Sequence, residues 1–316
     1  MPRHPFRFAI GTNGLKQRAP LMEHVRTAEA MGYSTVLVAD HLLDQLAPLL
    51  ALSAIAQATT HMRIGTFVLN NDLRHPAVLA QELATLDLLS DGRLDVGLGA
   101  GWNVPEYTAA GLEFEPHPVR FKRMSESLRI LKGLFGDGTV NFEGTHYRIT
   151  DMEGLPKPAQ KPHPPIMIGG GGKRMLQFAG REAQIVGLAP RLPSPANADL
   201  RSVLADATAE KIDWVRDAAG DRFDQLELNT YPCLGPIQVT EDPRKAAAEL
   251  SARLTERYGT ELTEDELLDS PHVFYGTVDQ LVDKITGLRE RFGISYVLVL
   301  GDMHAFAPVV ERLAGT

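Results

Sequence analysis

The sequence predicts an α/β protein built as a (β/α)8 barrel, the TIM barrel, with insertion segments. Eight short apolar runs alternate with segments of helical periodicity, and most runs are continuously apolar, as in parallel strands buried on both faces. Eight such units in 316 residues also fit the size of this barrel. The alternative is a long doubly wound sheet, and it is disfavoured because no G-x-G-x-x-G motif follows the first apolar run.

The expected strands are these apolar runs. In chain order they are residues 6–10, 35–39, 64–69, 94–98, 166–168, 184–188, 226–228 and 296–300. Helical segments separate them: the first ends at Gly32, and another opens at Pro76. The last helix is expected to begin with a capping box formed by Thr277 and Gln280 and to end at Gly293.

Three segments interrupt this alternation and are expected to be insertions. They are residues 102–120, residues 139–165 with a hairpin-like run at 141–149, and residues 259–275. Because loops carry specificity, we expect these insertions to shape a substrate pocket. No Pro/Ser-rich linker divides the chain, so a single domain over residues 1–316 is expected.

The charge balance indicates the class of partner. Lys and Arg number 32 against 40 Asp and Glu, a net charge of −8, and no basic run occurs. Nucleic acid and anionic membrane surfaces are therefore not expected partners, and a small-molecule substrate is.

Cysteine usage and the N-terminus indicate the compartment. The single cysteine, Cys233, cannot form an internal disulfide, and no Cys/His cluster predicts a metal site. Cys233 has no adjacent base, so we expect a small buried side chain and not a nucleophile. The chain opens without a signal-peptide pattern and has no apolar stretch of 18 residues, which predicts a cytoplasmic protein.

The first candidate site follows the second expected strand, which ends in Asp40 and His41. Active sites of such barrels lie at the carboxyl ends of the strands. An imidazole can exchange a proton near neutral pH, so His41 is a candidate acid or base. The alternative is that the pair only caps the following loop.

Glycines mark two further strand ends. Gly97, Gly99 and Gly101 alternate along the fourth strand, so they clear one face for a cofactor ring or merely relieve crowding. After the fifth strand the run GGGGKR at 169–174 enters a helix. Exposed amides and the helix dipole predict a phosphate site there, to which Lys173 or Arg174 could add charge.

These motifs carry a family resemblance. VADH at 38–41, RLDVGLGAGWN at 93–103, FEGTHYRI at 142–149 and PPIMIGGGGKR at 164–174 stand in the order expected of one family. With them, the whole chain resembles the bacterial luciferase-like monooxygenase superfamily, and within it the actinobacterial oxidoreductases that use the deazaflavin coenzyme F420. The resemblance implies a TIM barrel with insertions, usually a homodimer, that holds coenzyme F420 or, as the alternative, FMN.

The resemblance also implies roles for particular residues. His41 stands at the position of the family's active-site histidine, with Asp40 beside it as the other residue expected to act in catalysis. Phe67 and Val68 fall where members often have a non-prolyl cis peptide. The residues expected to bind the cofactor are Phe67, Val68, Asn70, Gly99, Ala100, Gly101, Trp102, Gly169, Gly170, Gly171, Gly172 and Lys173.

One position departs from part of the family. Deazaflavin-dependent sugar-phosphate dehydrogenases have a glutamate proton donor after the glycine pattern, whereas this chain has Trp102. Tryptophan cannot transfer a proton, so that substrate is disfavoured. The resemblance thus implies hydride transfer between coenzyme F420 and an unidentified small organic substrate. The alternatives are an FMN-dependent monooxygenase and a non-catalytic flavin-binding protein, the latter disfavoured because His41 is present.

Overall fold

The computed structural model of the protein describes residues 4–12, 14–194 and 197–316. Its internal contacts divide the chain into two compact units. Unit 1 contains the described residues of 1–13, 27–36 and 168–316, and unit 2 contains those of 14–26 and 37–167. Helix α1 (Arg18–Ala30) and strands β2 (Thr35–Val38) and β8 (Ile166–Gly170) contribute residues to both units.

Unit 1 is built on a run of hydrogen-bonded strands in the order β2-β1-β15-β12-β9-β8. Strand β1 (Arg7–Gly11) pairs in parallel with β15 (Ile294–Val299), and β12 (Glu227–Thr230) pairs in parallel with both β15 and β9 (Ile185–Leu188). These strands are buried along nearly their whole length, as continuous apolar runs require.

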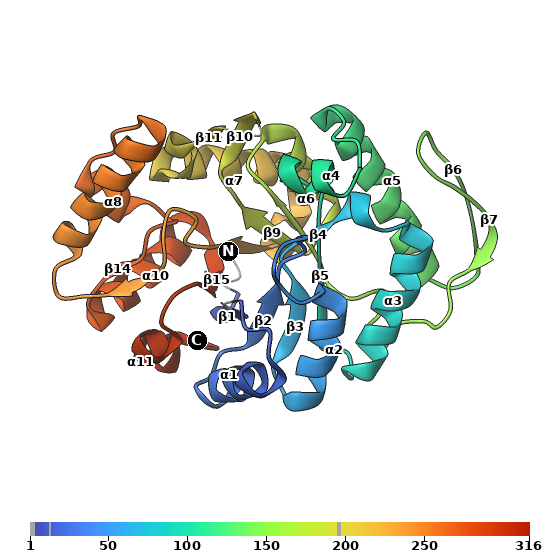
Figure 1. The fold of residues 1–316 in the computed structure, drawn as a ribbon, viewed down its shortest axis with the longest axis horizontal. Helices are drawn as coiled ribbons and strands as arrows, with labels where there is room; N and C mark the ends of the chain where they lie inside the picture. Colours follow the sequence, from blue (N-terminus) through green and yellow to red (C-terminus); the bar gives the residue numbers. More distant parts are fainter. Residues whose placement is uncertain (1–3, 13, 195–196) are drawn as a thin grey trace. The chain divides into compact units, whose positions relative to one another are not determined.

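The helices and short strands of unit 1 follow in chain order. They are α6 (Lys173–Glu182), β10 (Arg191–Ser194), β11 (Asn197–Asp199), α7 (Ala205–Ala219), β13 (Gln238–Val239), α8 (Pro243–Tyr258), α9 (Glu264–Asp269), β14 (Tyr275–Gly276), α10 (Val278–Phe292) and α11 (Met303–Leu313), with 3-10 turns η2 (Leu200–Val203) and η3 (Gly220–Gln225). Figure 1 shows α6 beside α7, and these two helices are in contact. Helix α10 begins with the predicted capping box of Thr277 and Gln280 and ends at left-handed Gly293.

Unit 2 repeats the pattern with the strand order β2-β3-β5-β8, and β4 is also paired with β5. Its further elements are α2 (Pro48–Ala58), β3 (Arg63–Thr66), β4 (Leu69–Asn70), η1 (Asn71–Leu73), α3 (Pro76–Leu89), β5 (Leu94–Gly99), α4 (Val104–Ala109), α5 (His117–Phe135), β6 (Thr139–Glu143) and β7 (Arg148–Glu153). Helix α5 contacts α3 and the hairpin β6–β7 (Figure 1).

The predicted fold class is confirmed: the eight expected runs form strands separated by helices, in the arrangement of a (β/α)8 TIM barrel. The third run is the exception in detail, because it divides into β3 and β4 around Phe67 and Val68. The division of contacts into two units leaves the expectation of a single domain as a prediction.

The predicted insertions carry their own elements. Residues 102–120 hold α4, residues 139–165 hold the antiparallel hairpin β6–β7, and residues 259–275 hold α9. The last is anchored by a small apolar core shared with α8, whose members are Leu200, Ala246, Ala247, Leu250, Leu254, Leu262, Leu267, Val273 and Tyr275. This core explains why a segment rich in acidic residues still folds against the unit.

Candidate active site

His41 lies in unit 2, three residues after β2, with its side chain 23% exposed. Its Nδ1 atom is 2.8 Å from Oε1 of Glu106 on α4. The indole of Trp102, which follows β5, meets the imidazole edge to face, with 5.6 Å between ring centroids and an interplanar angle of 85°. The side chains that follow β2 and β5 therefore meet at His41, as the prediction of a site at the carboxyl ends of the strands requires.

Glu106 is a site residue that the sequence analysis missed. It is 5% exposed and accepts a hydrogen bond from the amide of Leu42 at 3.3 Å and another from the side-chain amide of Asn103. One carboxylate thus holds the segment after β2 to the segment after β5. Its position in WNVPEY gives only a helical residue near an N-terminus, and its burial comes entirely from tertiary packing.

Asp40 does not share the site with His41 in the way its place in the sequence suggests. Its buried Oδ2 accepts hydrogen bonds from Arg74 Nη1 at 2.6 Å and from the amide of Asn70 at 2.9 Å, and Oδ1 accepts from Arg74 Nη2 at 3.2 Å. The partners of Asp40 therefore differ from that of His41, whose Nδ1 lies beside Glu106. These bonds hold the ends of β2 and β4 together, and the expected catalytic role of Asp40 stays a prediction.

Asn70 belongs to a second polar group in unit 2. Its Oδ1 accepts from the Tyr107 hydroxyl at 3.0 Å and from the Asp72 amide at 3.1 Å. The same hydroxyl lies 3.0 Å from Asp72 Oδ2, and burial together with the Asp72 carboxylate raises the pKa of Tyr107 to about 12. The side-chain oxygen of Asn70 thus accepts two hydrogen bonds within the protein. Contact between Asn70 and a cofactor stays a prediction.

Arg120 fixes the backbone after β5. From α5 it donates to the carbonyls of Ala100, at 2.8 Å, and Gly101, and its Nε donates to the carbonyl of Glu115 at 2.8 Å. Its guanidinium also lies 4.0 Å from the centroid of Phe114. Burial lowers the pKa of Arg120, and these carbonyl acceptors satisfy its buried donors.

The alternating glycines make room for the chain itself. The peptide between Phe67 and Val68 is cis, as the resemblance implied, and a Cβ at Gly99 would lie 2.7 Å from Val68 Cγ2. A Cβ at Gly97 would overlap the backbone of Thr66. The interpretation that the glycines relieve crowding therefore accounts for these two positions.

Gly101 is required by its backbone conformation and by a close neighbour. It adopts a left-handed φ of +74°, and a side chain there would collide with the Tyr107 hydroxyl. Contact of Gly99, Ala100 and Gly101 with a cofactor ring stays a prediction.

The glycine run at 169–172 lies in unit 1, where Gly169 and Gly170 end β8 and Gly171 and Gly172 lead into α6. Gly172 is exposed, caps α6 without a side-chain hydrogen bond, and has open space where its Cβ would stand. By contrast, a Cβ at Gly171 would overlap the backbone of Pro190, and one at Gly170 would collide with Met175. Of these three glycines, Gly172 alone has open space at the position of a Cβ. The neighbouring Lys173 Nζ lies 5.8 Å from the ring centroid of Trp214.

Cys233 is half-buried in unit 1, and burial raises the pKa of its thiol to about 12, with the Lys211 ammonium opposing that shift. A thiol with a raised pKa is a poor nucleophile, which agrees with the expectation that Cys233 is not a nucleophile, although its side chain is half-buried and not fully buried.

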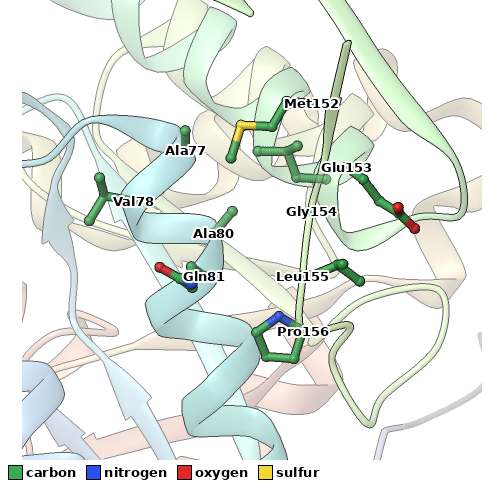
Figure 2. Close-up of a pocket in the computed structure, with 10 residues that line it drawn as sticks. Ala77, Val78, Ala80, Gln81, Met152, Glu153, Gly154, Leu155 and Pro156 are labelled. Carbon is green, nitrogen blue, oxygen red and sulfur yellow. The ribbon is translucent and has the colours of Figure 1, made fainter.

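A groove on unit 2 is formed by other residues than those described above. Residues of α3 and of the segment 152–156 line it, and Figure 2 shows α3 on one side and that segment on the other. None of its lining residues belongs to the predicted site. Among the described residues, no helix combines the length and apolarity needed to cross a membrane.

Comparisons with known proteins agree with the fold and with the resemblance. Residues 4–285 match the family described as luciferase-like monooxygenase. The F420-dependent glucose-6-phosphate dehydrogenase of Amycolatopsis mediterranei (strain U-32) is 30% identical over 270 residues, 78% of either chain. The FMNH(2)-dependent dimethylsulfone monooxygenase of Pseudomonas putida is 38% identical over 106 residues, which cover 34% of this chain and 29% of that one.

A solved structure supports the barrel. The coenzyme F420 dependent tetrahydromethanopterin reductase from Methanopyrus kandleri superposes with a TM-score of 0.75 over 97% of each chain, at 20% identity. At that identity the likeness establishes the fold.

Proposed function

Because the chain belongs to the luciferase-like monooxygenase family, we propose that it is an oxidoreductase that transfers a hydride between coenzyme F420 and a small organic substrate. The observation that carries the proposal is the side-chain group at His41, held between Glu106 and Trp102 at the ends of two barrel strands. The relative from Amycolatopsis mediterranei, similar over most of its length, supports the choice of cofactor.

The residues after β8 fit the phosphate of such a cofactor. The first amides of α6 have no partner within the helix, and the exposed Gly172 leaves the space before them open. Gly169, Gly170, Gly171, Gly172 and Lys173 would hold this phosphate. When bound, the deazaflavin supplies a carbon that accepts or donates a hydride.

His41 would handle the proton that accompanies the hydride. It is half-buried and lies at a strand end, and its Nδ1 is taken by Glu106, so the other ring nitrogen, Nε2, is the one to exchange a proton with substrate. Trp102 packs against the imidazole of His41 and would help to exclude water from it. Its indole N–H is not acidic enough to transfer a proton, so we propose that the substrate is not the sugar phosphate named for the curated relatives.

An FMN-dependent monooxygenase is the second candidate. The partial match to the Pseudomonas putida enzyme favours it, and the same α6 terminus would hold the phosphate of FMN. A homodimer and a cytoplasmic location stay predictions from the family resemblance and the sequence.

Titration of the purified protein tests the proposal. We expect coenzyme F420 to bind more tightly than FMN, measured by quenching of cofactor fluorescence. Preferential binding of FMN would instead favour the monooxygenase, and binding of neither would refute the assignment.

A variant then tests His41. His41→Ala should lower kcat by roughly 100-fold, the typical contribution of a positioned acid or base, and leave the cofactor Kd within about twofold. Normal turnover in that variant would remove the catalytic assignment of His41.

A further inference from the structure

The carboxylate of Glu106 is unusual for its burial and for its three neighbours. It is 5% exposed, and around it lie Nδ1 of His41 at 2.8 Å, the amide of Leu42 at 3.3 Å, and the side-chain amide of Asn103. The peptide and side-chain amides fix the carboxylate to the segments after β2 and β5. Of the three neighbours, only the imidazole of His41 can exchange a proton near neutral pH.

We propose that Glu106 is the positioning residue of this site: it orients the ring of His41 and holds a proton on Nδ1, which leaves Nε2 to exchange a proton with substrate. The inference rests on the proposed function for the role of Nε2, but the state of the ring follows from the local contacts alone. Glu106 does not touch the substrate in this scheme and acts through His41.

The tautomer follows from the donor and acceptor inventory. Carboxylate oxygens accept hydrogen bonds, so the imidazole nitrogen facing them is the one that bears hydrogen. A neutral imidazole has a single N–H, and Nε2 then carries the lone pair. Nδ1 lies 2.8 Å from Oε1 of Glu106 without the alignment of a hydrogen bond, and catalytic hydrogen bonds of this kind often become aligned only when substrate binds.

The neighbouring groups cannot replace Glu106 in this role. Asp40 is next in sequence, but its oxygens are bound by Arg74 and the amide of Asn70. Trp102 meets the imidazole through its ring and restricts its rotation without accepting its proton. Glu106 is therefore the group that determines which ring nitrogen of His41 is protonated.

The proton and electron balance is that of a hydride transfer. With an alcohol as substrate, the O–H bond would break and the proton would move to Nε2 of His41, while the hydride of the adjacent C–H bond would pass to the deazaflavin that the glycines at 169–172 would hold. The substrate would lose two electrons and become a carbonyl compound, and the hydride would carry those two electrons. The positive charge then left on the imidazole lies beside the carboxylate of Glu106, which stabilises it.

The tautomer can be read without substrate or cofactor. Nitrogen NMR of the full-length protein labelled with 15N-histidine distinguishes the two tautomers by the shifts of Nδ1 and Nε2, and His41→Ala identifies the signals of His41. We expect Nδ1–H in the wild type and a mixture of tautomers in Glu106→Gln. A predominant Nε2–H form in the wild type overturns the inference.

Kinetics test the consequence for turnover. Glu106→Gln should lower kcat at least tenfold with the cofactor Kd within about twofold, and it should have no further effect in the His41→Ala background, because two residues that act as a unit are not additive. An equal loss in both backgrounds means a structural role and overturns the inference, as does an unchanged kcat. Failure of F420 and FMN to bind would refute the proposed function and leave the NMR result to decide the role of Glu106.

A matched control is Glu115→Gln. Glu115 is also a carboxylate of unit 2 in an ion pair, but its partner is Arg123. We expect the Glu115→Gln protein to keep the wild-type tautomer of His41 and a kcat within twofold. A change in tautomer equal to that in Glu106→Gln would show that the effect is not specific to Glu106 and would overturn the inference.

Discussion

A negative charge at Gly172 should separate phosphate binding from folding. Gly172 has an extended backbone, with φ of −95° and ψ of 149°, that any residue adopts, and nothing lies within 4 Å of its missing Cβ. The side chain of an aspartate there would cap α6, which lacks a side-chain cap. Its negative charge would also interact favourably with the positive end of the helix dipole. Gly172→Asp is therefore expected to maintain or raise the free energy of unfolding, by up to about 1 kcal/mol.

The same charge would oppose a bound phosphate. Two like charges at about 4 Å repel by about 1 kcal/mol in water and by about 4 kcal/mol near a protein surface. The exposure of Gly172 favours the lower figure, so Gly172→Asp should bind cofactor at least fivefold more weakly than Gly172→Asn, which has the same shape and no charge. Fluorescence titration at low salt measures the two Kd values, and urea unfolding measures stability.

Two results would refute the reasoning. Equal Kd values for the Asp and Asn variants would show that no phosphate lies at the α6 terminus, and so would a difference that persists unchanged in 1 M salt, where such repulsion is screened. Gly171→Ala serves as the contrast. Its Cβ would overlap the backbone of Pro190, so it should lower stability whether or not cofactor is present.

Two further predictions concern buried polar groups. Burial lowers the pKa of His272 to about 3, so between pH 6.5 and 3 the unfolded state binds more protons than the folded state and stability falls as pH falls. The loss from pH 7 to pH 4.5 should be about 3 kcal/mol smaller in His272→Asn, by urea unfolding at both pH values, and equal losses would show that His272 is not the cause. Asp40→Asn should lower the free energy of unfolding by about 2 kcal/mol, because it leaves Arg74 without its buried partner. If this variant instead keeps full stability and loses turnover, Asp40 has the catalytic role that its sequence position suggested.

The fold was predictable because its determinants are local and repeated. Strand β15 and helix α10 illustrate this: a continuous apolar run gives a buried strand, and Thr277 with Gln280 gives a capping box. The break at Phe67 and Val68 was not predictable from the apolar run 64–69, because its hydrophobicity is uninterrupted there. Only the resemblance to a family indicated a cis peptide at that position.

Candidate site residues could be chosen from the sequence where residue type and position along a strand or helix were enough. They could not be chosen where only the folded structure brings residues together. His41 at a strand end and Gly172 before a helix follow from position and residue type. The pairing of Asp40 with Arg74 was not predictable, because the two residues are far apart in the sequence and only folding brings them together. Glu106 was missed since nothing local distinguishes it from a solvated helical residue, and only folding places it 2.8 Å from His41.

The pairing of Asp40 with Arg74, and of Arg120 with the carbonyls after β5, bears on how this protein can diverge. Asp40 holds strand ends through Arg74 and the amide of Asn70, and Arg120 does so through main-chain carbonyls. The side chains of Leu42 and Trp102 are 55% and 52% exposed. Mutation can therefore exchange these two side chains at little cost to those attachments, so the surface beside His41 can change while the underlying barrel is inherited unchanged.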